Sequence, residues 1–325
     1  MWRYCIQMKQ SEKTYYFIVN ACAGSGRGKT IWKDILKPTL ICHGVYYRAY
    51  LCTYAGHATV LARRVLAERS GDVTLVVVGG DGTFNEVLNG ISDFDRVTLG
   101  FIPIGSANDL GFALGISDDP REALLRILRC RRIACVDLGK TTFHRDESSR
   151  YFAISSGIGL DAEACRFSHG GRIKNMLNRM HLGMLTYLVN AVRLVFRQPL
   201  GVAKLVFSDA RGHKRVMKVR GLYFLAGMNQ PNEGGHLLMA PHASARDGKL
   251  SFAMAYGLGR MQALVSLALL VLRRHERIPG YEVVNARKCH VMLQDNLEVH
   301  TDGENFGGHW DITLECLPKK LQVIL

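Results

Sequence analysis

One stretch of the sequence, residues 74–90, constrains the fold more than any other. It reads TLVVVGGDGTFNEVLNG: a β-branched apolar run, three glycines within four residues, and then helix-forming residues. A buried strand that breaks at glycines and restarts as a helix leaves backbone N–H groups at a positive helix end, which favours phosphate. The carboxylate of Asp81, among these glycines, favours a divalent cation next to the phosphate. The alternative is an ordinary glycine turn between a strand and a helix.

Length, charge and cysteine usage limit the class of protein. The 325 residues are enough for two domains, although one large domain is the alternative. The net charge of +14 favours anionic partners such as nucleotides, nucleic acid or an anionic membrane. Nine cysteines without a C-x-x-C pair predict a reduced, cytoplasmic chain with neither a disulfide framework nor a zinc site. The start of the chain lacks a secretory segment, and the longest apolar run, residues 263–272, is too short to span a bilayer.

The first half of the chain alternates strands and helices. We expect strands at residues 15–19, 45–52, 73–78 and 98–102, and a helix at 120–130. Three of these strands run into glycine-rich polar loops, at residues 20–30, 79–86 and 103–109. In an open α/β sheet, loops at the carboxyl ends of strands gather at one edge, where ligands bind. The first loop nearly matches the P-loop pattern, with Ala23 in place of its first glycine and with Lys29 and Thr30 at its end, so a P-loop-like NTPase is an alternative.

The second half is rich in strands and predicts a mostly antiparallel domain. The expected strands are residues 132–139, 151–155, 204–208, 215–228, 249–255, 289–293 and 297–301. Apolar residues at helical spacing in 172–197 and 260–274 predict helices that either pack across the sheet or form the lip of a lipid-binding cleft. The last strand, 321–325, is predicted to return to the first domain.

Two late turns carry acidic residues. The turn at 241–250 contains Asp247 and free carbonyls, which suit a hard cation as well as a plain hairpin turn. In residues 300–304, two acids flank a glycine at a strand end. They would serve as a general base or metal ligand, or form a surface turn.

Together these segments resemble the diacylglycerol kinase catalytic-domain family, and in particular its bacterial soluble lipid kinases, which are akin to sphingosine, ceramide and NAD kinases. Residues 79–86 match the family motif G-G-D-G-T-x-N-E completely. Residues 103–109 match P-x-G-T-x-N-D with Ser106 for threonine, and 20–24 match N-P-x-x-G with Ala21 for proline. Thr53 with residues 56–58 matches T-x-x-G-x-A. Residues 159–162 and 229–241 match motifs of the second domain.

The resemblance implies an α/β fold with two domains. Residues 1–135, with 313–325 returning, would form a Rossmann-like ATP-binding domain, and residues 136–312 a mostly antiparallel β-sandwich for the lipid. The residues implied in ATP binding are Asn20, Ala21, Cys22, Ala23, Gly24, Thr53, Gly80, Asp81, Gly82, Thr83, Phe84, Asn85, Glu86, Ser106, Asn108 and Asp109.

The resemblance also implies the catalytic and metal-binding residues. Glu304 would be the catalytic base, with Asp81 and Asp302 as further catalytic residues, and Asp81 would hold Mg²⁺ directly or through water. A second, structural Mg²⁺ would bind the Asp247 side chain and the carbonyls of Ser244 and Lys249.

The resulting hypothesis is a Mg²⁺- and ATP-dependent kinase that phosphorylates a hydroxyl of a lipid alcohol, with diacylglycerol as the first choice. A sphingoid base, phosphatidylglycerol or undecaprenol is the alternative substrate. The basic residues of 211–220 would hold the enzyme at the anionic inner face of the membrane, or form an ordinary solvated hairpin. A nucleic-acid partner is not expected, because no DNA- or RNA-binding motif accompanies the positive charge. Monomer and homodimer both remain open.

Overall fold

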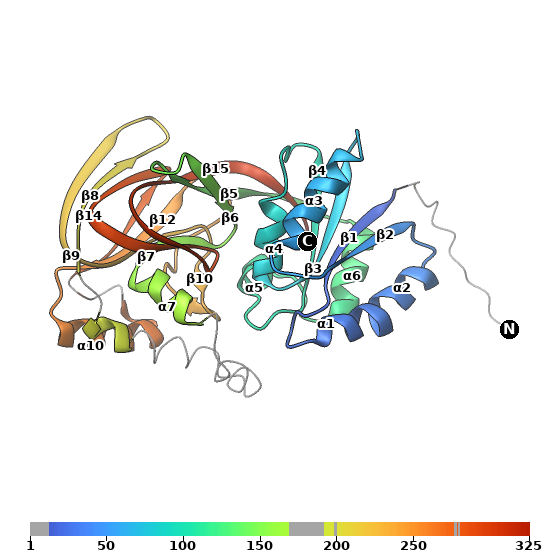
Figure 1. Ribbon diagram of the computed structural model, residues 1–325, viewed down its shortest axis with the longest axis horizontal. Coiled ribbons are helices and arrows are strands. Elements are labelled where there is room, and N and C mark those ends of the chain that lie inside the picture. Colours follow the sequence, from blue (N-terminus) through green and yellow to red (C-terminus); the bar gives the residue numbers. More distant parts are fainter. Residues whose placement is uncertain (1–12, 169–191, 198–199, 276–277, 279) are drawn as a thin grey trace.

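The protein consists of an α/β lobe and a β-rich lobe (Figure 1). The computed structural model describes residues 13–168, 192–197, 200–275, 278 and 280–325. Two long strands, β5 (Ile133–Phe143) and β15 (Glu304–Ile324), run between the lobes. The predicted mixed fold with two domains is confirmed.

The α/β lobe contains a parallel sheet in the order β4-β3-β1-β2. Its strands are β1 (Tyr15–Asn20), β2 (Tyr47–Cys52), β3 (Val73–Gly79) and β4 (Val97–Pro103), and all four had been predicted. One face packs on α3 (His57–Ala67) and α4 (Asp81–Leu88). The other packs on η1 (Ile31–Leu36), α2 (Lys37–Cys42) and α6 (Pro120–Arg129). Two short helices, α1 (Arg27–Thr30) and α5 (Asp109–Leu114), follow the loops after β1 and β4.

Strand β1 shows why this sheet needs helices on both faces. Ile18 faces the α3–α4 side, whereas Phe17 and Val19 face the η1–α2 side, and all three are fully buried. Strands buried on both faces are continuous apolar runs, as the sequence YYFIV shows. The sheet therefore holds its strand ends, and the loops that follow them, in fixed positions.

The β-rich lobe is built from antiparallel strands around an apolar core. Inward-facing residues such as Leu205, Phe252, Val291 and Leu314 fill that core. The helices α7 (Leu160–Ser168) and α10 (Arg260–Val271) contribute to a second apolar cluster with β9 and β12. The strands besides β5 and β15 are β6 (Ser148–Phe152), β7 (Ser155–Gly159), β8 (Gly201–Ser208), β9 (Lys214–Met228), β10 (Asn232–Glu233), β11 (Leu237–Leu238), β12 (Leu250–Tyr256), β13 (Tyr281–Ala286) and β14 (Lys288–Thr301).

Three sequence predictions for this lobe need correction. The strand expected at 151–155 is two strands, β6 and β7, because the Asp302 carboxylate accepts the backbone N–H groups of residues 153–155. The strands expected at 289–293 and 297–301 are one strand, β14, with an irregular register between them. Strands β10, β11 and β13 are missing from the sequence prediction. Most of the helix expected at 172–197 lies outside the described residues. The part that is described, residues 192–197, is helical.

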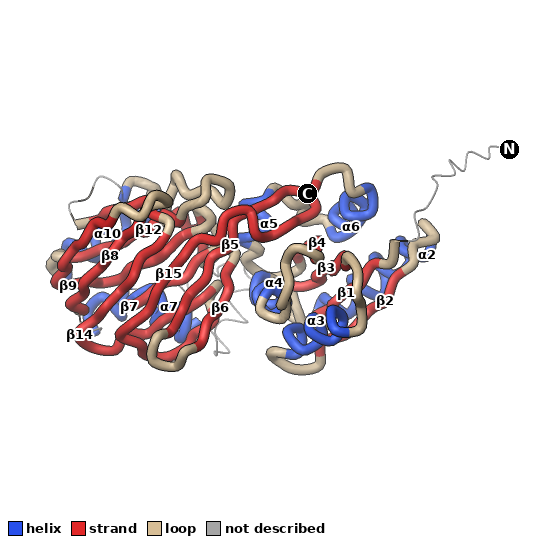
Figure 2. The backbone as a smooth tube through the Cα atoms, turned by 90° about the horizontal axis from the view of Figure 1, so that it is seen from above, coloured by secondary structure: helices blue, strands red, loops and turns tan. Residues whose placement is uncertain are grey.

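Strand β15 ties the two lobes into one sheet. It pairs with β14 in the β-rich lobe and then, near its end, in parallel with β4, where Gln322 lies opposite Thr98. The predicted return of the last strand is therefore present, and the sheet is continuous through thirteen strands (Figure 2). The proposed domain boundary at residue 135 stays a prediction, because β5 runs through it. Since β15 begins at Glu304 and ends against β4, it fixes that residue relative to the α/β lobe.

Candidate active site

The three glycine-rich loops pack together at the carboxyl edge of the parallel sheet. Asn20 Nδ2 donates to Thr83 Oγ1 at 2.9 Å, which joins the first loop to the second. Gly80 lies against Gly105 of the third loop, where a Cβ on Gly105 would be 2.6 Å from the Gly80 Cα. Gly24, with φ +59°, comes so close to the Ile104 carbonyl that a Cβ would lie 2.4 Å from its oxygen. These contacts require glycine and bring backbone N–H groups to one place.

Asp81 lies in the second of these loops and is the first residue of α4. Its two carboxylate oxygens accept the backbone N–H groups of Asp109 at 3.0 Å and Leu110 at 3.2 Å, at the start of α5. Burial, and then the negative charge of Asp109, raise the pKa of Asp81 to about 7, against the two N–H donors that lower it. Because burial and the charge of Asp109 disfavour the ionised form of Asp81, a cation bound beside this carboxylate would be strongly stabilising.

Asp109 links the site to the β-rich lobe. Its carboxylate accepts the N–H groups of Gly235 at 3.0 Å and His236 at 2.7 Å, and only 4% of the residue is exposed. The loop after β10 is thereby held against the third glycine-rich loop.

Asp302 makes the second link between the lobes, and its carboxylate is fully occupied. It accepts three backbone N–H groups, from residues 153, 154 and 155, at 2.8–3.0 Å, and the side-chain amide of Asn85 at 2.8 Å. Asn85 belongs to α4 and is itself buried. Burial raises the pKa of Asp302, whereas these donors lower it. The geometry fits a residue that positions the turn before Glu304.

We expect Asp302→Ala to destabilise the fold. The substitution leaves three backbone donors and the Asn85 amide without their acceptor, so we expect the free energy of unfolding to fall by about 3 kcal/mol. Urea denaturation followed by circular dichroism would measure the change. The matched control is Asp95→Ala, because Asp95 pairs with Lys320 on the surface and is 80% exposed; its effect should stay below about 0.5 kcal/mol. Equal effects of the two substitutions would refute the positioning role.

Glu304 follows this turn and differs from Asp302 in its surroundings. Burial and then the charge of Glu86 raise its pKa, whereas Arg150 lowers it. Among the described residues no hydrogen bond to its carboxylate is found. Asp302 raises the pKa of both Glu304 and Asp81, so the three carboxyl groups share one electrostatic environment. Glu304 is thus a carboxylate with free oxygens at the junction of the lobes.

The other predicted ATP-binding residues fall into two groups. Cys22, Gly82, Thr53 and Ser106 are exposed along the loops, and Ala21, Ala23 and Asn108 are partly exposed there. The Thr53 hydroxyl lies 3.1 Å from His57 Nδ1. Phe84, by contrast, is 1% exposed and packs against Phe101, so its side chain belongs to the core and does not face the loops. Glu86 accepts the N–H of Ala58 at 3.1 Å, at the start of α3.

The P-loop alternative is not supported by the first loop. The N–H groups of Gly26, Gly28 and Lys29 donate to the loop's own carbonyls at 3.1 Å, of Cys22, Ala23 and Ala21 respectively. A P-loop uses such N–H groups to surround phosphates. Here they close the turn instead.

The predicted second metal site lies apart from the loops. Asp247 is exposed, and its Oδ1 accepts the N–H of Lys249 at 3.1 Å. The turn is held by Asp137, which accepts the N–H groups of Gly248 and Lys319 at 2.7 Å. The carbonyls of Ser244 and Lys249 as ligands stay a prediction.

Three buried polar residues near the site were not singled out from the sequence. His300 Nε2 lies 2.6 Å from Asp161 Oδ2, and both side chains are 1% exposed. Gly157 leaves room for this pair, since its Cβ would lie 2.3 Å from the Asp161 carboxylate. Burial, and then Asp161, raise the pKa of Glu233 well above its usual value, with Asp109 adding to the effect. The sequence signal for Glu233 was its place directly before two glycines of the 229–241 motif.

Comparison with known proteins identifies the family. Residues 14–141 match the family described as diacylglycerol kinase catalytic domain. Residues 157–325, more than half of the chain, match the YegS C-terminal NAD kinase beta sandwich-like domain. The chain belongs to the diacylglycerol kinase family. It is therefore a lipid kinase, an enzyme that phosphorylates a lipid with ATP as co-substrate.

Individual relatives agree with this assignment over nearly the full length. The chain is 28% identical over 298 residues to the Bacillus subtilis protein named "Putative lipid kinase YtlR", covering 90% of this chain and 94% of that one. It is 28% identical over 285 residues to a diacylglycerol kinase of Staphylococcus saprophyticus, covering 86% of each chain. A solved structure titled "A putative diacylglycerol kinase from Bacillus anthracis str. Sterne" shares the fold, with a TM-score of 0.75 at 23% identity over 96% of this chain and 97% of that one.

None of the described helices is both long and apolar enough to cross a membrane.

Proposed function

We propose that the enzyme transfers the γ-phosphate of ATP to the hydroxyl of diacylglycerol, giving phosphatidic acid, with Mg²⁺. The observation that carries the proposal is the meeting of the glycine-rich loops with the Asp302–Glu304 turn at the junction of the lobes. Phosphoryl transfer requires groups that position the phosphates and neutralise their charge, and a group that accepts the proton of the attacking hydroxyl. This junction supplies both.

The phosphates would lie at the start of α4. The first N–H groups of a helix have no partner within it, so those of Gly82 and Thr83 are available as donors. Asp81 and Asp109 fit Mg²⁺, because each carboxylate oxygen retains a lone pair beyond its one backbone donor, and a cation would relieve the repulsion that raises the pKa of Asp81. Mg²⁺, when bound, would neutralise charge on the phosphates.

Glu304 would accept the proton of the lipid hydroxyl. Its raised pKa strengthens it as a base, and no donor among the described residues occupies its oxygens. Asp302 and Asn85 act through Glu304 by holding its turn against α4. We therefore assign Asp302 a positioning role within the predicted catalytic set.

A mixed apolar and basic surface supports contact with an anionic membrane. Met261 (68% exposed), Val265 (58%) and Leu272 (64%) extend along and beyond α10, and Phe196 of the neighbouring helical segment is 53% exposed. Arg260 donates to the Val195 carbonyl, which joins the two segments. The exposed basic residues of this surface are Arg193, Arg197, Arg273 and Arg274. Apolar insertion with surrounding arginines suits a peripheral enzyme whose substrate lies in the bilayer. This surface and the 211–220 hairpin are therefore two candidate sites for membrane docking.

Lys29→Ala distinguishes the lipid kinase from a P-loop enzyme. Lys29 is exposed and its N–H closes the first loop, so we expect the variant to keep at least about half of the kinase activity. A P-loop lysine binds the β- and γ-phosphates, and its loss would remove nearly all turnover. Steady-state kinetics with ATP as the varied substrate would separate the two outcomes.

The substrate proposal is tested with radiolabelled ATP, Mg²⁺ and a panel of lipid alcohols in mixed micelles. Labelled phosphatidic acid should be the main product. Preferential labelling of a sphingoid base, phosphatidylglycerol or undecaprenol would keep the kinase and replace its substrate. Light scattering of the same preparation would decide between the monomer and the homodimer.

A further inference from the structure

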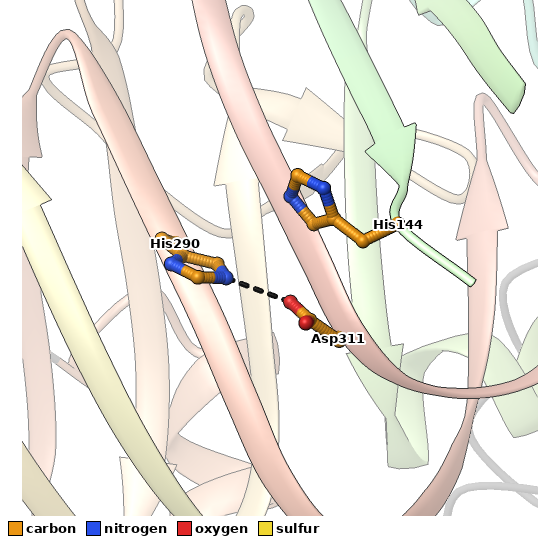
Figure 3. A group of neighbouring side chains, drawn as sticks. All are labelled: His144, His290 and Asp311. Carbon is orange, nitrogen blue, oxygen red and sulfur yellow. Dashed lines mark hydrogen bonds and ion pairs between the residues drawn. The ribbon is translucent and has the colours of Figure 1, made fainter. Parts of the chain in front are cut away.

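Two histidines and an aspartate lie close together in the β-rich lobe (Figure 3). His144, His290 and Asp311 each offer a ligand atom, and these atoms lie within 4.8 Å of one another. His290 Nε2 is 2.7 Å from Asp311 Oδ1, and the rings of His144 and His290 have centroids 5.2 Å apart. His144 is exposed, and the side chains of His290 and Asp311 are 35% and 22% exposed.

The sheet register fixes this arrangement. His290 on β14 lies opposite Thr313 on β15, and His144, just after β5, donates its backbone N–H to the Asp311 carbonyl. Asp311 and Thr313 are two residues apart and so share one face. Their neighbour Ile312 points into the core. The Thr313 hydroxyl, 2.8 Å from His144 Nε2, lies beside the group and holds that ring. Three adjacent strands thus present the group on a rigid support.

The chemistry of the group suits a borderline transition-metal ion. Imidazole nitrogens prefer Zn²⁺, Cu²⁺ or Ni²⁺, whereas Mg²⁺ and Ca²⁺ prefer oxygen ligands. Zinc bonds to nitrogen and carboxylate oxygen at roughly 2.0–2.2 Å, so ligand atoms must approach to within about 4 Å. The ligand atoms lie within 4.8 Å of one another, so binding requires them to approach by about 1 Å. We propose that His144, His290 and Asp311 form a zinc site, with water as the fourth ligand.

Cysteine spacing could not reveal this site, because none of its ligands is a cysteine. Its ligands come from residues that lie far apart in the chain and meet only when β5, β14 and β15 pair. Those strands also carry the turn before Glu304 and the connection to the α/β lobe. A bound ion would cross-link the three strands, and because it binds the folded arrangement, it would stabilise that arrangement.

The experiment titrates chelator-treated, full-length protein with Zn²⁺ alone in competition with a chromophoric chelator. We expect one Zn²⁺ per chain at this site, a rise in Tm of about 5 °C at saturation, and no displacement by millimolar Mg²⁺. His290→Gln and His144→Gln should each lower the zinc affinity at least about tenfold. The matched control is His213→Gln, because His213 and Asp209 form a similar exposed pair at 2.9 Å that has no third ligand among the described residues. Its affinity should equal that of the unsubstituted protein.

A second group, Asp161, Cys165 and His300, offers a competing location. Co²⁺ distinguishes the two, because thiolate ligation produces an intense near-ultraviolet charge-transfer band that histidine and carboxylate ligation lacks. Loss of zinc binding in Cys165→Ser together with its retention in His290→Gln would overturn the proposal. So would unchanged affinity in both histidine variants. Lipid kinase activity is measured separately, so failure of the zinc site leaves the proposed reaction untouched.

Discussion

Asp81→Asn should abolish lipid kinase activity and at the same time stabilise the metal-free protein at pH 8. We expect turnover to fall at least about 1,000-fold, because a neutral amide cannot hold the cation or balance the phosphates. The pKa of Asp81 is raised from 3.8 to about 7, so its ionised form costs the fold up to about 4 kcal/mol at pH 8. Asparagine removes that cost but leaves one of the two N–H donors without an acceptor, at about 1 kcal/mol. The net gain is about 2–3 kcal/mol.

The sign of the pH dependence gives a second measurement. Because the folded-state pKa is raised, the stability that Asp81 contributes is fully present below about pH 4 and is lost as pH rises to about 7. Urea denaturation at several pH values should therefore show a steeper loss of stability with rising pH in the unsubstituted protein than in Asp81→Asn. Mg²⁺ should stabilise the unsubstituted protein at pH 8 more than the variant, which keeps only the predicted second site at Asp247. A variant with full activity, or an equal response of both proteins to Mg²⁺, would remove Asp81 from the proposed cation site.

The glycine-rich loops could be predicted from the sequence because their signals are local. Residues 79–86 contain the strand end, the turn and the helix start within eight residues. The parallel sheet then brings this loop to the same edge as the loops after β1 and β4. Phe84 shows the limit of a motif. It lies among residues assigned to ATP binding, yet the helical turn after Asp81 directs its side chain toward Phe101 in the core.

Contacts between distant segments could not be predicted. Nothing near Asp302 in the sequence shows that residues 153–155 would donate to its carboxylate, which requires β7 to lie beside β14. Glu233 is buried and feels the charges of Asp161 and Asp109, which are distant in the chain, and the loop after β10 donates to Asp109 of the α/β lobe. The length of β15 could not be predicted either, because this strand continues through both lobes and pairs with β14 in one and with β4 in the other.

Glu304→Gln should lower kcat by about 100- to 10,000-fold while ATP affinity changes less than about threefold. Glutamine has the size of glutamate but cannot accept the proton of the lipid hydroxyl. The described structure shows no hydrogen bond to the Glu304 carboxylate, so the substitution breaks no contact and the fold should keep its stability. At saturating Mg²⁺, which keeps Asp81 ionised, activity of the unsubstituted enzyme should rise with pH through the raised pKa of Glu304, and the variant should lack this limb. Kinetics across pH, with ATP affinity from isothermal titration calorimetry, would measure both.

Glu298→Gln is the matched control, because Glu298 lies on β14 in the same hairpin and its Oε2 accepts the Asn305 amide at 2.8 Å. Glutamine retains an oxygen for that bond, so this variant should keep both its turnover and its pH profile. Equal losses in the two variants would mean that charge anywhere in the hairpin matters, and the base would have to be sought elsewhere. A loss of ATP affinity in Glu304→Gln as large as the loss of kcat would make Glu304 a nucleotide or metal ligand. Only a selective loss of kcat in Glu304→Gln, together with the loss of the alkaline limb in that variant, identifies Glu304 as the group that takes the proton.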